Sequence, residues 1–252
     1  MASVCGHGVL LLAGLWLALG SGAANPWPRP VGETYTRTEV EGFRSGDAGT
    51  EFSQLVVREY VELGLGDVLT LGGQVANMRF EAQGPGYHNI GTGVSEAELF
   101  ASVHRPADGR LVSAWRATGG FPTAKFIRGQ RAMGQDAFIG IDRLWGLGSE
   151  RLFSVVEAGV RSSLGDDAVQ LRVGAKIGFK RGRSMLIAES RNVIAVSEAH
   201  GQGNDFDLGQ MSVSAVLPLT DHFQVELGGR ADTYIRNIDR GQAVFFAVWL
   251  TL

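Results

Sequence analysis

Ser102 and His104 are the residues of this sequence that come closest to a catalytic arrangement. A serine nucleophile needs a histidine base within hydrogen-bond distance. If both residues lie on one strand, their side chains share a face but stand about 7 Å apart, which is too far for a direct bond. The sequence also lacks the G-x-S-x-G, Walker and H-E-x-x-H motifs. We therefore expect that the chain is not an enzyme.

Asp and Asn side chains in two short polar stretches are the candidate metal ligands. They are Asp166, Asp167, Asn204, Asp205 and Asp207. Such oxygens can bind Ca²⁺, but neither stretch has the ligand spacing of an EF-hand loop. The single cysteine, Cys5, lies in the N-terminal segment and offers no thiolate site to the rest of the chain. We expect solvated loop charges here, with no metal and no cofactor.

The N-terminal segment has the pattern of a secretion signal. Residues 9–19 form an apolar run of eleven residues, whereas a membrane-spanning helix needs roughly 20. Small residues follow at 20–24, and small side chains at this place are what signal peptidase accepts. The sequence therefore predicts a signal peptide over residues 1–24, cleaved after Ala24. An uncleaved anchor or a buried helix is the alternative.

The composition limits what the rest of the chain can be. The 252 residues are 44% hydrophobic and 19% charged, include 36 glycines, and carry a formal net charge of −3. These values exclude a disordered or collagen-like chain. They also provide no basic surface for nucleic acid. The length suits one large all-β domain or two ordinary domains.

Apolar and polar residues alternate with period two after residue 30, and no helical period is sustained. In residues 169–180, for example, Val173 and Ile177 share one face while Arg172 and Lys176 share the other. Segments of about ten residues have the length that a tilted membrane strand needs. The segments are 32–43, 52–63, 68–83, 96–105, 110–119, 135–145, 151–162, 169–180, 183–196, 210–217, 223–232 and 242–252. We expect about twelve antiparallel strands.

Connection lengths separate a membrane barrel from a soluble sandwich or lipocalin, whose strands also alternate. Outer-membrane barrels have short turns at one end and longer loops at the other. The short connections are 64–67, 106–109, 146–150, 181–182 and 218–222, and the long ones include 84–95, 120–134 and 197–207. Short and long connections follow one another in turn along the chain. This order favours a membrane barrel.

The last strand gives a second indication. Val244, Phe246, Val248, Leu250 and Leu252 form an apolar face that runs to the terminus. This face resembles the C-terminal signal that the barrel-assembly machinery reads in bacterial outer-membrane barrels, with Leu at the end where Phe is usual. Aromatic residues also fall near strand ends, as in the interfacial girdles of membrane barrels. They are Trp145, Phe179, Phe223 and Trp249.

Residues 32–252 as a whole resemble a small Gram-negative outer-membrane β-barrel of the porin-like kind. The resemblance implies an all-β antiparallel transmembrane barrel of about twelve strands in the bacterial outer membrane, with both termini periplasmic. Residues 25–31 would then be a short periplasmic N-terminal segment. The implied partners are outer-membrane lipids and lipopolysaccharide, and the barrel-assembly machinery during biogenesis. Nucleic acid is not among them.

Strand parity predicts which charged side chains line the lumen. They are Arg37, Glu39, Arg58, Glu62, Glu98, Glu157, Arg161, Arg172, Lys176, Glu226, Arg230 and Asp232. The cations among them on residues 151–180 and 223–232 could form a cluster that attracts anions. We therefore predict a narrow channel for passive diffusion of small polar or anionic solutes.

Two alternatives to a channel remain open. Internal salt bridges between the same charges would plug the lumen of a structural, assembly or anchoring protein. A lipid A- or phospholipid-modifying enzyme is less favoured, because no nucleophile and base are evident. The loop 120–134 carries Lys125, Arg128 and Arg131. It could contact lipopolysaccharide phosphates or fold inward as a constriction.

Overall fold

The computed structural model of the chain is a closed antiparallel β-barrel. It describes residues 26–47, 49–108, 111–123, 126–128, 131–133, 136–165, 168–196, 206–236 and 240–252. The predicted signal peptide at 1–24 and the candidate metal ligands Asp166, Asp167, Asn204 and Asp205 lie outside the described residues.

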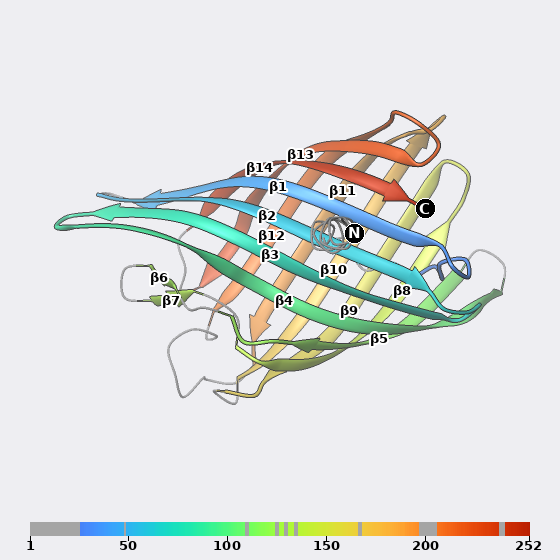
Figure 1. Cartoon of the computed structure of the whole chain (residues 1–252), viewed down its shortest axis with the longest axis horizontal. Coiled ribbons are helices and arrows are strands. Elements are labelled where there is room, and N and C mark those ends of the chain that lie inside the picture. The colour runs from blue at the N-terminus through green and yellow to red at the C-terminus, as the bar shows by residue number, and fades with distance from the viewer. Residues whose placement is uncertain are drawn as a thin grey trace, which may run out of the picture.

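Twelve strands of the described chain close the barrel in sequence order, so each strand pairs with its neighbour in the chain (Figure 1). They are β1 (Thr34–Asp47), β2 (Thr50–Gly64), β3 (Leu69–Gly84), β4 (Tyr87–Asp108), β5 (Leu111–Gly120), β8 (Phe138–Gly148), β9 (Leu152–Ser163), β10 (Val169–Arg181), β11 (Ser184–Ala195), β12 (Asp207–Pro218), β13 (Phe223–Arg236) and β14 (Gly241–Thr251). A small hairpin of β6 (Phe126–Arg128) and β7 (Arg131–Met133) stands apart, between β5 and β8. The predicted all-β antiparallel barrel of about twelve strands is confirmed.

β1 and β14 close the barrel, and their pairing brings the two ends of the described chain together. The backbone N–H of Thr34 donates to the carbonyl of Leu252 over 2.8 Å. We call this the terminal end of the barrel, and the opposite end, where β1 joins β2, the loop end. No helix of the described residues is long and apolar enough to cross a membrane.

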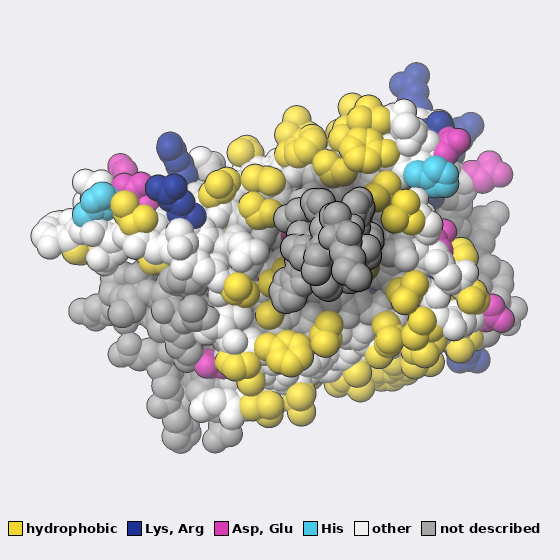
Figure 2. All heavy atoms as spheres, viewed as in Figure 1, with side chains coloured by type: hydrophobic (Ala, Val, Ile, Leu, Met, Phe, Trp, Pro, Cys, Tyr) yellow, Lys and Arg dark blue, Asp and Glu magenta, His cyan; other side chains and the backbone are white. Residues whose placement is uncertain are grey.

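The outer surface of the barrel is apolar. Val213 and Val244, for example, are 64% and 69% exposed. Exposed Ile, Leu, Val and Phe residues recur around the outside of the barrel. Figure 2 shows these apolar side chains spread over the visible wall of the barrel. An exposed apolar surface of this extent is rare on soluble monomers but is what membrane barrels present to lipid. The predicted outward faces of β10 and β14 are therefore confirmed.

One predicted connection is wrong. Residues 84–95 were expected to be a long loop, but β3 runs to Gly84 and β4 begins at Tyr87. Pro85 and Gly86 make the turn, with Gly86 at a φ of 85°, as a Pro-Gly pair favours in a tight turn. Residues 88–95 lack apolar alternation because they belong to a long hairpin whose β3–β4 tip projects at the loop end (Figure 1).

Aromatic rings on the inner wall lie over glycines of the neighbouring strand. A β-carbon on any of these glycines would be 2.3 Å or less from a ring carbon. The cross-strand pairs are Phe80 with Gly91, Phe100 with Gly72, Phe138 with Gly120, Phe153 with Gly178, and Phe245 with Gly228. The absent side chains let the rings lie against the wall, so that large residues take up less of the lumen.

Candidate channel lumen

None of the twelve predicted lumen residues is exposed: each is either buried or of intermediate exposure. Arg37, Glu39, Glu62, Glu226 and Asp232 are buried. The remaining ones are intermediate in exposure: Arg58, Glu98, Glu157, Arg161, Arg172, Lys176 and Arg230. This burial fits the strand parity from which the residues were listed, and their role as pore-lining residues stays a prediction.

Four charged residues form a network at the middle of the barrel. The Arg58 guanidinium donates to Glu39 over 2.8 Å and lies 3.4 Å from Glu41. Arg230 reaches Glu41 from the other side of the β1–β14 closure and donates to it over 2.7 Å. Two guanidinium groups therefore share one fully buried carboxylate.

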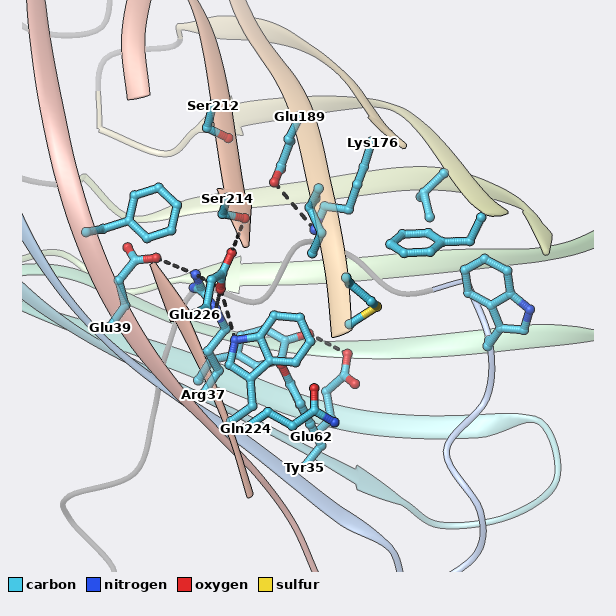
Figure 3. A pocket seen from close by; sticks show the side chains of 18 of the residues that line it. Tyr35, Arg37, Glu39, Glu62, Lys176, Glu189, Ser212, Ser214, Gln224 and Glu226 are labelled. Carbon is cyan, nitrogen blue, oxygen red and sulfur yellow. Dashed lines mark hydrogen bonds and ion pairs between the residues drawn. The ribbon is translucent and has the colours of Figure 1, made fainter. Parts of the chain in front are cut away.

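A second network lies closer to the terminal end. Arg37 donates to Glu226 over 2.8 Å and to Glu39 over 2.6 Å. Glu226 also accepts from the hydroxyl of Ser214 over 2.6 Å and from the indole N–H of Trp249 over 2.9 Å (Figure 3). Every one of these bonds satisfies a charged or polar group that the barrel has removed from bulk water.

The opposite wall carries charges that the sequence analysis did not assign. Glu189 on β11 is paired with Lys176 over 3.4 Å and with Arg191 over 2.5 Å. Arg191 also interacts electrostatically with Glu39 across the lumen. Residues 183–196 show weak apolar alternation, but the inward series of Ile187, Glu189 and Arg191 follows the same period of two and could have been read from it.

Two further inward residues, Arg116 and Asp142, were also missed. The Nε of Arg116 donates to Ser102 over 3.1 Å, and its guanidinium lies 3.6 Å from Glu62. Asp142 is buried beside Gly159, where its carboxylate fills the space that a side chain would take. Arg116 is the one charged residue of β5, whereas Asp142 is followed directly by Arg143 in β8. Parity was therefore the signal that could have found both.

The predicted cluster of cations is divided among separate acidic partners. Arg161 donates to Glu98 over 2.8 Å, while Lys176 and Arg230 pair with the acids of the two walls described above. Arg172 lies close enough to Arg161 and Asp142 for electrostatic interaction. The lumen therefore presents alternating charges of both signs and not one positive patch.

Residues 26–29 lie inside the mouth at the terminal end, and the exposed residues 30–32 connect them to β1. Arg29 donates to Glu62 over 2.7 Å, and Trp27 packs edge-on against Phe153 with ring centroids 6.4 Å apart. Burial alone would lower the pKa of the Arg29 guanidinium, but the attraction of Glu62 raises that pKa above its ordinary value. Gly146 lacks a side chain where Pro26 and Trp27 pass. This segment narrows the mouth from within.

His104 and Ser102 hold structural positions in this mouth. One ring nitrogen of His104 is 2.9 Å from the carbonyl oxygen of Pro26, and the other is 3.1 Å from the hydroxyl of Thr70. Ser102 accepts from Arg116 and not from His104. No group of three or more acidic, His or Cys side chains among the described residues is arranged to hold a metal ion. Asp207, a candidate ligand, instead pairs with Arg236 over 2.9 Å.

Two cavities occupy the lumen. The terminal cavity, of about 640 Å³, reaches from the central charges to Trp27 and Thr251 at the mouth. The loop cavity, of about 920 Å³, lies towards the loop end. Arg230 and Ser212 line both cavities. The two cavities therefore lie next to each other at Arg230, a member of the central charge network, and the space they occupy is not filled by side chains.

Comparison with known proteins agrees with this geometry. No protein-family model and no curated protein matches the sequence. An outer-membrane channel from Pseudomonas putida F1 matches with a TM-score of 0.72 at 13% identity, over 92% of this chain and all of that one. The NanC porin matches with 0.56 at 8% identity, over 85% of this chain and 100% of that chain.

The β domain of the Bordetella autotransporter BrkA matches with a TM-score of 0.53 at 12% identity, over 88% of this chain and 100% of that one. Identities this low establish the fold alone. The chain therefore has the fold of the bacterial outer-membrane β-barrels, as the sequence predicted, and no narrower family is identified.

Proposed function

We propose that this chain is a narrow outer-membrane channel, and not an enzyme, through which small polar or anionic solutes diffuse passively. The observation that carries the proposal is the unfilled lumen. Cavities of about 640 Å³ and 920 Å³ lie next to each other at Arg230 and Ser212. A barrel of twelve strands lies between filled eight-stranded barrels and open porins, which suits a narrow path.

The charges where the two cavities lie next to each other suit a channel for small polar molecules. Glu39, Glu41, Arg58 and Arg230 come from three strands and hold one another at fixed positions. A passing solute that bears hydrogen-bonding groups can exchange bonds with this network, whereas an apolar wall would offer it nothing to replace water. Rings of charged side chains are a recurrent selectivity device in pores.

The likeness to solved outer-membrane channels supports the same proposal at the level of fold. The proposed orientation places the terminal end in the periplasm, with residues 26–33 on that side. The apolar outer wall would contact membrane lipids, and lipopolysaccharide in the outer leaflet. The apolar last strand, β14, would be the contact for the barrel-assembly machinery during biogenesis.

A structural or anchoring protein with a plugged lumen is the second candidate. The observation that favours it is the number of ion pairs that reach between strands, together with the segment 26–29 in the mouth. On this view the charges satisfy one another and admit no solute. The same barrel and the same ion pairs are compatible with an open channel and with a plugged barrel. Only the open channel conducts ions, so a conductance measurement distinguishes the two candidates.

The test is planar-bilayer recording with the purified full-length protein in potassium chloride. Heat-modifiable migration on SDS gels first shows that the sample is folded. We expect discrete current steps of small conductance, as a narrow pore requires. A folded sample that gives no steps above the background of an empty bilayer would overturn the channel proposal and favour the plugged barrel.

A further inference from the structure

We infer that the loop cavity is a binding site for a small monocarboxylate with a flat apolar body, and that solutes of this class pass the channel in preference to others. The second half of this inference rests on the proposed channel function, and the first half does not. Nothing in the ion-pair networks described above requires such a site.

Among the residues that line the loop cavity, the inward-facing ones form one row across six neighbouring strands, and the rest are the residues directly before and after them in each strand. Cross-strand pairing links them in the order Ser212, Arg230, Ala243, Phe43, Gln54 and Phe80, from β12 through β13, β14, β1 and β2 to β3. All six line the cavity. Ser212 and Arg230 therefore stand at one end of the row, while Gln54 lies between Phe43 and Phe80 at the same level of the barrel.

The polar part of this row has hydrogen-bonding capacity to spare. Among the described residues, the Nε of Arg230 and the Oε1 of Gln54 are buried and have no hydrogen-bond partner. Arg230 uses its Nη2 to bind Glu41, which Arg58 also approaches to 3.4 Å. Buried polar groups are nearly always satisfied, so a guanidinium donor and an amide oxygen left over in one cavity indicate a ligand that completes them.

The apolar part of the row presents flat surfaces. Phe80 lies over Gly91, and a β-carbon on Gly241 would be 2.0 Å from the Phe43 ring. Phe52 stacks on Phe80 with an interplanar angle of 21° and centroids 6.1 Å apart, and meets Phe43 edge-on. These rings, with Ala82 and Met78, form one buried apolar cluster. A wall of this kind accepts a flat ring better than a hydrated ion.

These features define the class of ligand. One free N–H on a guanidinium that is already paired with a shared carboxylate suits a single negative charge, and the planar carboxylate matches it. A half-turn of the Gln54 amide would exchange its Oε1 for its NH2 group, which could then donate to the second oxygen of the head group. The volume of about 920 Å³ lies within the range of small-molecule sites. The head would lie at Arg230 and the body against Phe43 and Phe80.

The test uses three probes that separate the two parts of the ligand: benzoate, acetate as a head without a body, and benzyl alcohol as a body without a charge. Binding to the detergent-solubilised full-length barrel is measured by saturation-transfer NMR with titration, against empty micelles. We expect saturable binding of benzoate, and binding of the other two that is at least about tenfold weaker, because each lacks one set of contacts.

Two variants place the site. Arg230→Gln should weaken benzoate binding about tenfold or more, since it removes the charge-assisted bond, and Phe43→Leu should weaken it through loss of the flat ring. Arg105→Gln is the matched control, because Arg105 is exposed on the outer wall of β4 and lines neither cavity. Heat-modifiable migration on SDS gels shows which variants fold. If only one of the two cavity variants folds, the test is made with that variant alone.

The outcomes are distinct. Benzoate binding that both cavity variants weaken and the control retains supports the site, even if the protein conducts nothing in a bilayer. Equal binding of benzoate by all folded variants, or no binding above empty micelles, overturns it. In a conducting barrel, a permeability ratio of benzoate to acetate above that expected from their sizes supports the transport half, and a ratio at or below that value overturns it.

Discussion

The ring of Phe80 on β3 covers the α-carbon of Gly91, its direct partner on β4. A β-carbon on Gly91 would lie 2.3 Å from the Phe80 Cε1 atom. The same relationship recurs around the inner wall, so the width of the lumen depends on where side chains are absent as much as on which are present.

Gly91→Val should therefore narrow the channel. The new side chain forces the Phe80 ring away from the wall and into the loop cavity, and overpacking of this kind costs about 1–3 kcal/mol. We expect roughly half the single-channel conductance and a lower urea midpoint for unfolding. Gly119→Val is the matched control, because no atom lies within 4 Å of its β-carbon position. Equal effects of both substitutions would contradict this account of the wall.

Glu41→Gln should make the channel more selective for anions. The substitution removes the carboxylate that Arg58 and Arg230 share and leaves both guanidinium groups with less compensation. Breaking a buried pair in this way costs about 3–5 kcal/mol. Reversal potentials in a potassium chloride gradient measure the selectivity, and Glu51→Gln, on the exposed surface at the loop end, should leave it unchanged. A shift towards cations would contradict the proposed role of this network.

Arg29→Ala should enlarge the terminal mouth. The side chain loses its 2.7 Å bond to Glu62 and its position over the Tyr35 ring, so residues 26–33 are held less tightly. We expect larger single-channel conductance, by about a factor of two, with more frequent current fluctuations. Arg151→Ala changes an exposed arginine in the β8–β9 turn and should have no effect. Unchanged conductance in Arg29→Ala would show that this segment does not limit the pore.

Val213→Lys should impair folding into lipid. Val213 is near the middle of β12 on the apolar outer wall and is 64% exposed, and a lysine at the bilayer midplane costs about 2–4 kcal/mol. Leu219→Lys, at 61% exposure in the turn after β12, should cost about 0–1 kcal/mol because it lies near the interface. Urea titration of folding into lipid vesicles compares the two. Equal costs would contradict the proposed depth of the barrel in the membrane.

The sequence was sufficient for much of the fold because membrane strands repeat one simple pattern. Val173 and Ile177 faced lipid and Lys176 faced the lumen, as alternation required. The pattern failed at residues 88–95, which are strand but extend beyond the apolar belt. Residues 88–90 are exposed and 93–95 are partly buried, so the segment carries no alternation to read.

The candidate site was predictable only in its list of residues. Parity put Arg230 and Arg161 inside the barrel, but only the register between distant strands shows that Glu41 and Glu98 are their partners. The role of residues 26–33 could not be derived, because Arg29 binds an acid on β2 and Trp27 a ring on β9. Such contacts are set by the closure of the barrel and leave no local signal.

The docking of residues 26–33 also constrains the order in which the molecule forms. Pro26 contacts His104 on β4, Trp27 contacts Phe153 on β9, and Thr34 bonds to Leu252 at the very end of the chain. Contacts between such distant residues form only after the intervening loops have closed. We therefore expect the earliest described part of the chain to dock among the last, so that its burial would mark a barrel whose strands have already paired.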